Sequence, residues 1–174
     1  TTNEFADITE SPIPMWSLIN LNDYVTMPIQ YSRGCPENCE FCDVRIMFGN
    51  KPRTKTNEQI IAELESLCKA GWTGALFIVD DNFIGHKKKT KELLTHIIKF
   101  QKKYGYPLNL TTEATIRLAG DIELMELMRE ANFIKVFIAI ELLDLQQFTL
   151  YYYNTIIYSI HFPFVEAQVV KSKL

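Results

Sequence analysis

The sequence lacks the features that mark several classes of protein. It has no clustered excess of lysine and arginine, and its net charge of -3 with an isoelectric point near 5.6 gives no electrostatic footprint for nucleic acid. Its four cysteines are not spaced as the disulfide framework of a secreted protein. A length of 174 residues is enough for one domain with a hydrophobic core. We therefore expect a single cytoplasmic domain with no nucleic-acid partner.

The sequence also has neither the pattern of a targeting segment nor that of a membrane span. Residues 1–16 contain no basic stretch followed by an apolar one, as a signal peptide would. Residues 148–165 are apolar but are interrupted by Asn154, His161 and Pro163, and they fall short of the ~20 apolar residues of a membrane helix. We expect neither export nor a membrane span.

Apolar runs typical of strands alternate with segments of helical period between residues 25 and 141. The expected strands cover residues 25–32, 75–80, 107–114 and 133–141, and the expected helices cover residues 56–71, 86–104 and 121–131. Thr56 and Gln59 predict a capping box, and Asp121 predicts an N-cap. This α/β alternation predicts right-handed βαβ units, about four of them, and a parallel sheet that is open or closed into a barrel.

The pattern divides the chain into three parts. Residues 1–24 are rich in Asp, Asn, Ser and Pro and predict an irregular lead-in or linker. Residues 25–141 form the expected core, and residues 142–174 are an atypical tail with no assigned structure. Within the core, a long loop over residues 33–55 carries three cysteines, and loops of that length are usually functional.

Polar residues follow the expected strands at the points where the strands end. The cysteines follow the first strand, residues 80–82 (Asp-Asp-Asn) follow the second, Glu113 lies in the third and Glu141 ends the fourth. Since ligands of parallel α/β folds gather at the carboxyl ends of the strands, we expect these side chains to converge on one site.

Cys35, Cys39 and Cys42 are separated by three and then two residues, so one tight loop can wrap them around a single inorganic centre. Three thiolates bind three irons of a [4Fe-4S] cluster and leave the fourth iron open, unlike the four-cysteine sets of ferredoxins. A structural zinc site is the alternative, and it would recruit a fourth ligand from Cys68, His86 or His96.

This C-x-x-x-C-x-x-C pattern, with Phe41 before the last cysteine, resembles the signature of the radical S-adenosylmethionine (SAM) superfamily. The resemblance implies a partial parallel (β/α) barrel and a [4Fe-4S] cluster that binds SAM through its open iron. It also implies an enzyme that reductively cleaves SAM to methionine and a 5'-deoxyadenosyl radical. In such an enzyme the cofactor carries the chemistry and the protein positions and shields it.

The resemblance also implies roles for individual residues. Phe41 would contact the adenine of SAM, and the turn of Asp80, Asp81 and Asn82 would receive its methionine amino group. Glu113 and Glu141 stand at strand positions that commonly hold ribose or methionine groups. The alternatives are a plain turn for residues 80–82 and structural ion pairs for the two glutamates.

Three phrases, YSRGCPENCEFCDVRIMFGNKPRTKT, FIVDDNFIG and TTEATIRLA, look like a subgroup of radical enzymes with a cobalamin-binding domain, which includes hopanoid methylases. The resemblance covers roughly residues 12–141. It implies methyl transfer or hydrogen abstraction on a small-molecule or lipid-like substrate, with a flavodoxin-like or ferredoxin-like electron donor. Because the cobalamin domain and the end of the barrel are not in this sequence, we expect a fragment of a longer enzyme, and an inactive fragment or a metal-stabilised structural module are the alternatives.

Overall fold

The computed structural model describes residues 5–40, 42–141, 155–161 and 168–171, with side chains as far as Ile138. Within this part of the chain, six strands form one sheet in the order β1-β4-β5-β6-β7-β8, and β2 and β3 form a separate pair. The strands of the main sheet are β1 (Met27–Ile29), β4 (Gly74–Ile78), β5 (Leu108–Ala114), β6 (Phe133–Glu141), β7 (Thr155–His161) and β8 (Gln168–Lys171).

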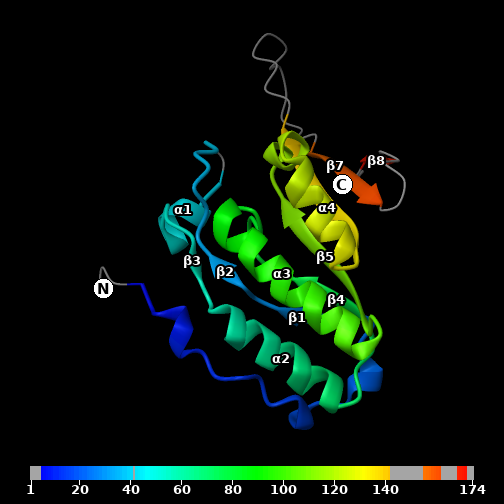
Figure 1. The fold of residues 1–174 in the computed structure, drawn as a ribbon. Coiled ribbons are helices and arrows are strands. Elements are labelled where there is room, and N and C mark those ends of the chain that lie inside the picture. The colour runs from blue at the N-terminus through cyan, green and yellow to red at the C-terminus, as the bar shows by residue number, and fades with distance from the viewer. Residues whose placement is uncertain (1–4, 41, 142–154, 162–167, 172–174) are drawn as a thin grey trace.

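The strands β1, β4, β5 and β6 run parallel to one another in chain order. The helices α2 (Asn57–Lys69), α3 (Lys87–Tyr104) and α4 (Ile122–Glu130) connect them and cover one face of the sheet (Figure 1). This arrangement confirms the predicted alternation and the partial parallel barrel. The strands β7 and β8 then continue the sheet in antiparallel fashion, which the sequence did not predict.

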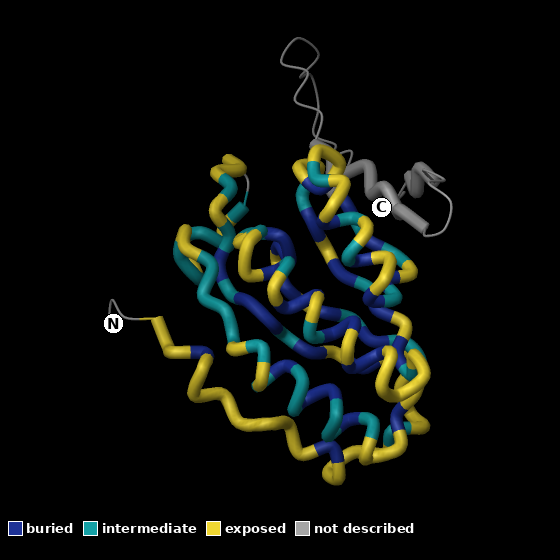
Figure 2. Tube along the Cα trace, viewed as in Figure 1, coloured by how far each residue is buried: buried dark blue, intermediate teal, exposed yellow. Residues whose placement is uncertain are grey.

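The hydrophobic core lies between the three helices and the sheet, where the burial colours of Figure 2 turn dark blue. Along β5, Leu110 and Thr112 face the helices and are buried, whereas Asn109 and Glu113 point to the opposite face and are exposed. That opposite face carries Phe77 and its neighbours, and in a (β/α) barrel it is the face that lines the interior. The wholly apolar run of residues 75–79 is typical of a strand covered on both faces, but in β4 only alternate residues near the end are buried.

The first strand is shorter than predicted, because residues 25–32 do not form one continuous strand. β1 ends at Ile29, and Ser32–Arg33 form β2, which pairs with β3 (Arg53–Thr54) in an antiparallel ladder. The break has a physical cause, since the backbone N–H groups of Tyr31 and Ser32 donate to the Asp80 carboxylate at 2.8 and 2.9 Å. The N–H groups that would extend a strand are thereby used elsewhere.

The predicted caps at the starts of α2 and α4 are confirmed. Thr56 and Gln59 form both halves of a capping box at the start of α2, and Asp121 caps α4 by accepting from the Leu124 N–H at 3.1 Å. Gly105 ends α3 in the left-handed conformation with φ of +72°, which glycine adopts without steric cost. One short helix, α1 (Val44–Phe48), lies inside the long cysteine loop.

The lead-in winds along the outside of α2 through three short 3-10 turns (Figure 1). Ile8 and Trp16 are buried, while Met15 and Leu18 are largely exposed. In the tail, residues 142–154, 162–167 and 172–174 lie outside the described residues. No helix within the described ranges is long and apolar enough to cross a membrane.

Candidate functional site

The carboxyl ends of the parallel strands meet at one edge of the sheet, as the sequence predicts. The Val79 N–H donates to the Ile29 carbonyl at 2.8 Å, and the Phe83 N–H donates to the Glu113 carbonyl at 3.0 Å. These bonds tie the turn after β4 to the strands on both sides of it. The turn therefore lies between the first and third strand ends, which is where a ligand of this fold binds.

The cysteine loop leaves β2 and returns through β3. The Cys35 N–H donates to the Gly49 carbonyl at 3.2 Å, and the Cys42 N–H donates to the Cys39 carbonyl at the same distance. Gly34 has φ of +95°, and a Cβ at this position would lie 2.9 Å from the Gly49 carbonyl oxygen. Only glycine fits this close approach of two backbone segments, which sets the start of the loop.

Two side-chain contacts that the sequence did not predict hold the loop in place. The Arg117 guanidinium, from the segment after β5, pairs with Glu37 at 3.2 Å, and Arg45 of α1 donates to Asn38. Glu37 and Asn38 both lie between the first two cysteines. The loop is thus attached to the third strand unit as well as to its own helix.

Asp80 is buried, with an exposed fraction of 1 %, and both carboxylate oxygens are hydrogen-bonded within the protein. One accepts from the Tyr31 N–H, and the other accepts from the N–H and, at 2.7 Å, from the hydroxyl of Ser32. Burial raises the pKa of Asp80 to about 6, against the lowering effect of these bonds. The contacts give Asp80 a structural task, which is to fix the start of the cysteine loop.

Asp81 and Glu113 are placed differently, with carboxylates near one another at the open edge of the sheet. Burial raises the pKa of Asp81, while the Arg33 guanidinium opposes that rise. Burial also raises the pKa of Glu113, and the charge of Asp81 raises it further. A partly buried carboxylate whose ionisation is disfavoured by the charge of a second one is a suitable site for a positively charged group.

Asn82 connects the strand edge to the cysteines. Its side-chain NH2 group donates to the Sγ of Cys35 at 3.8 Å, and the residue is 2 % exposed. Its Oδ1 is buried and has no hydrogen-bond partner among the described residues. An orphaned polar atom beside a cysteine indicates that a further group belongs at this point.

The three thiols fit an iron-sulfur cluster by their chemistry and by their place at the strand edge. Within the described ranges, no three Cys, His, Asp or Glu side chains lie close enough together to bind one metal ion. This holds for Cys35, Cys39 and Cys42 as it does for Cys68, His86 and His96. Cys68 packs against the core of the sheet, as expected for a small hydrophobe. We expect the three thiolates to come together as a metal centre binds.

Two predicted site residues are not placed by the structure. Phe41 lies outside the described residues, and Glu141 is described only as the last backbone position of β6. Their predicted contacts with SAM stay predictions. Among the residues that are placed, Asp81, Asn82 and Glu113 come together at the strand edge.

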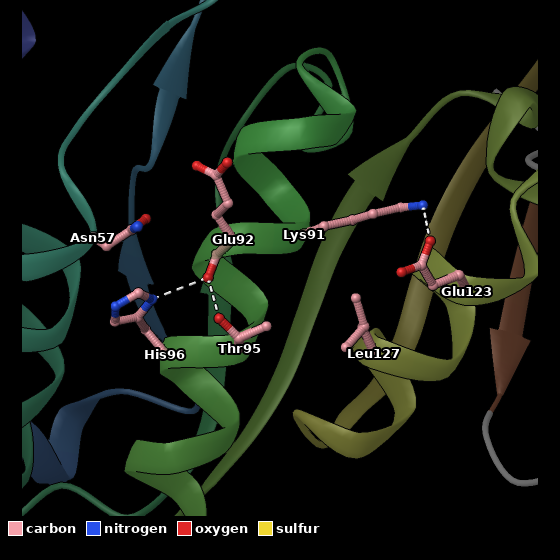
Figure 3. Close-up of a pocket in the computed structure, with 7 residues that line it drawn as sticks. All are labelled: Asn57, Lys91, Glu92, Thr95, His96, Glu123 and Leu127. Carbon is pink, nitrogen blue, oxygen red and sulfur yellow. Dashed lines mark hydrogen bonds and ion pairs between the residues drawn. The ribbon is translucent and has the colours of Figure 1, made fainter.

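A separate groove of about 440 Å³ lies between α3, α4 and the start of α2 (Figure 3). Its polar side chains bind their neighbours, as when Lys91 contacts Glu123 at 2.6 Å and the Thr95 hydroxyl donates to the Glu92 carbonyl at 2.7 Å. The groove lies on the helical face of the molecule, and its lining includes none of the residues predicted to bind the cluster or SAM. Of the candidate ligands of the zinc alternative, His96 lines it. We therefore place the functional site at the strand edge.

Comparison with protein families gives one match, since the model of the radical SAM superfamily matches residues 29–154. An uncharacterised methyltransferase of Synechocystis is 46% identical over 154 residues, which are 87% of this chain and 29% of that protein. The hopanoid C-2 methylase of Rhodopseudomonas palustris is 46% identical over 144 residues, which are 83% of this chain and 27% of that protein. The chain thus spans less than a third of these relatives, and its similarity to hopanoid methylases is confirmed.

A solved structure gives independent support for the fold. The radical SAM methyltransferase TsrM of Kitasatospora setae, solved with cobalamin and a [4Fe-4S] cluster, superimposes with a TM-score of 0.60 at 20% identity. The match covers 67% of this chain and 22% of that one. At this identity the likeness shows the fold alone.

Proposed function

The chain belongs to the radical SAM superfamily, and from this premise we propose that Cys35, Cys39 and Cys42 hold a [4Fe-4S] cluster at the strand edge. The contact between Asn82 and Cys35 is the observation that carries the proposal. It joins the cysteine loop to the turn after β4, so that cluster and cofactor share one site. A bound cluster supplies the electron that cleaves SAM to methionine and a 5'-deoxyadenosyl radical.

The described residues of the site divide between binding and support. Asp81 and Glu113 would accept hydrogen bonds from the ammonium and ribose groups of SAM. The positive charge of the ammonium group would offset the Asp81 charge that helps to raise the pKa of Glu113. Asp80 and Arg117 hold the cysteine loop in place through Ser32 and Glu37. Phe41 covers the adenine and Glu141 binds the ribose or methionine, by analogy with the family.

The reaction proposed for the whole enzyme is methyl transfer, or hydrogen abstraction, on a lipid-like substrate. The hopanoid C-2 methylase at 46% identity supports both the methyl transfer and the substrate class. The cobalamin in the TsrM structure supports a cobalamin-binding parent. We place the protein in the cytoplasm, where a flavodoxin-like or ferredoxin-like donor reduces the cluster.

Metal analysis after anaerobic reconstitution with iron and sulfide tests this proposal. We expect a brown protein that holds about four irons and four sulfides per chain, as the cluster requires, and that releases methionine from SAM when reduced. A colourless protein that retains one zinc per chain would favour the structural module instead. A protein that loads the cluster but leaves SAM intact would favour an inactive fragment.

A further inference from the structure

We infer that Asn82 is a positioning residue that raises the reduction potential of the cluster through its hydrogen bond to Cys35. The inference rests on the proposed function, because it requires Cys35 to be a cluster ligand. The Asn82 side-chain nitrogen lies 3.8 Å from the Cys35 Sγ, and the bond is partly buried. Asn82 is 2 % exposed, and Cys35 is half-buried. Low local polarity strengthens such a bond relative to one in water.

The turn that carries Asn82 is held rigidly, so its amide is aimed before any cluster binds. The Gly85 N–H donates to the Asn82 carbonyl at 2.9 Å, and the Thr90 hydroxyl donates to the Phe83 carbonyl at 3.0 Å. The same turn contacts the cysteine loop a second time. A Cβ at Gly85 would lie 3.1 Å from Pro52 and 3.3 Å from Pro36, the residue after Cys35.

The chemistry of a bound thiolate fixes what this amide does. A metal-bound sulfur has no proton and can only accept a hydrogen bond, so the NH2 group and not the Oδ1 must face it. Reduction adds negative charge to the cluster and its thiolates, and an N–H donor stabilises that charge. Hydrogen bonds to sulfur are among the features that set the potential of iron-sulfur clusters.

The test is a redox titration of the reconstituted full chain, followed by EPR in the absence of SAM. Asn82→Leu keeps the approximate volume and removes the donor. We expect its midpoint potential to become more negative by about 59 mV, which is a tenfold change in the equilibrium constant of a one-electron reduction. An unchanged potential in Asn82→Leu would overturn the inference.

Thr90→Val is the matched control, because Thr90 supports the same turn but does not contact a cysteine. Its potential should equal that of the wild type. If Thr90→Val shifts the potential as much as Asn82→Leu does, the cause is loosening of the turn and the inference is wrong.

Asn82→Asp at pH 8 provides a second variant of the same shape, which accepts but does not donate. It should lower the midpoint potential by at least as much as Asn82→Leu does. It is also the variant to measure if Asn82→Leu binds no cluster.

Failure of both variants to assemble a cluster, with Thr90→Val loading normally, would overturn the inference, because a tuning bond is not needed for assembly. Failure of the wild type to assemble one contradicts the proposed function itself, whereas a SAM-responsive wild type with unshifted variants contradicts only the role of Asn82.

Discussion

The helix-covered face of the sheet and its carboxyl edge differ in the kinds of side chain that they bury. On the covered face, side chains such as Leu93 and Leu110 are fully buried and apolar, and they contribute by packing against one another. At the edge, the buried polar residues Asp80 and Asn82 lie beside apolar ones. Asn82 Oδ1 and Thr115 Oγ1 have no hydrogen-bond partner among the described residues. The first region stabilises the fold, while the second has polar atoms available for the cofactor site that we propose.

Asp80 lies at the border of these two regions. It is an acidic residue of the strand edge, yet its carboxylate is used entirely by Tyr31 and Ser32. Its neighbour Asp81 is directed to the open edge instead. We propose that these neighbouring residues of one turn serve the fold and the ligand respectively, and the substitutions below separate the two tasks.

The largest expected effect belongs to the edge. Cys39→Ala should abolish cluster assembly, because a cubane held by three thiolates cannot lose one of them. Iron and sulfide content after reconstitution measures this. Cys68→Ala is the control and should load normally, since Cys68 packs on the core. A fully loaded Cys39→Ala protein would show that the ligand assignment is wrong.

The next effect belongs to the core. Leu93→Ala should lower the free energy of unfolding by about 2–5 kcal/mol, as expected when a fully buried leucine is truncated. Chemical denaturation of the cluster-free chain measures the loss. Ile122→Ala, at an exposed position, should change it by less than about 0.5 kcal/mol. Equal losses in the two variants would contradict the placement of α3 against the sheet.

Asp80→Asn should cost about 1–3 kcal/mol, because an amide offers one acceptor oxygen where the carboxylate offers two, and it leaves a buried N–H unsatisfied. The same denaturation experiment measures the change. Asp81→Asn is the matched control and should leave stability nearly unaltered while weakening SAM binding. The opposite ranking of the two variants would reverse the division of tasks proposed for this turn.

Asp80 also predicts a dependence of stability on pH. Its pKa in the folded state is raised from the ordinary 3.8 to about 6, so the folded state binds this proton more tightly than the unfolded state does. The contribution of Asp80 to the free energy of unfolding should therefore decrease as the pH rises from about 4 to about 6, and then level off. Subtracting the pH profile of Asp80→Asn from that of the wild type isolates the effect. A difference that increases over this range would contradict it.

The smallest effect is a local one in a helix outside the site. Thr56→Ala removes the side-chain half of the capping box of α2 and should cost about 1 kcal/mol. Cluster content should stay at the wild-type level. A loss of cluster from this variant would mean that the start of α2 contributes to the edge.

Local patterns predicted most of the fold. The capping box at Thr56 and the Asp121 N-cap depend on residues close in sequence, and both are present. The split of the first strand was not predictable. The Asp80 carboxylate that accepts from the Tyr31 and Ser32 N–H groups lies 49 and 48 residues away from them in the sequence. The antiparallel return of β7 onto β6 likewise follows no pattern that the tail displays.

The site was predicted as a set of residue types and less well as a set of contacts. The cysteine spacing and the polar strand ends pointed to the carboxyl edge of the sheet, and the structure brings Asp81, Asn82 and Glu113 together there. The pairing of Arg117 with Glu37 had no signal in the sequence, since both are ordinary charged residues in loops. Nor did the sequence distinguish Asp80 from Asp81, because the difference lies in which backbone groups each side chain meets.

The EPR spectrum of the reduced, reconstituted chain before and after addition of SAM tests the central claim most directly. If the three cysteines and the strand edge form one cofactor site, SAM binds the open iron and the spectrum shifts. Asp81→Asn should then require more SAM for the same shift. A reduced cluster whose spectrum is identical with and without saturating SAM would contradict the account.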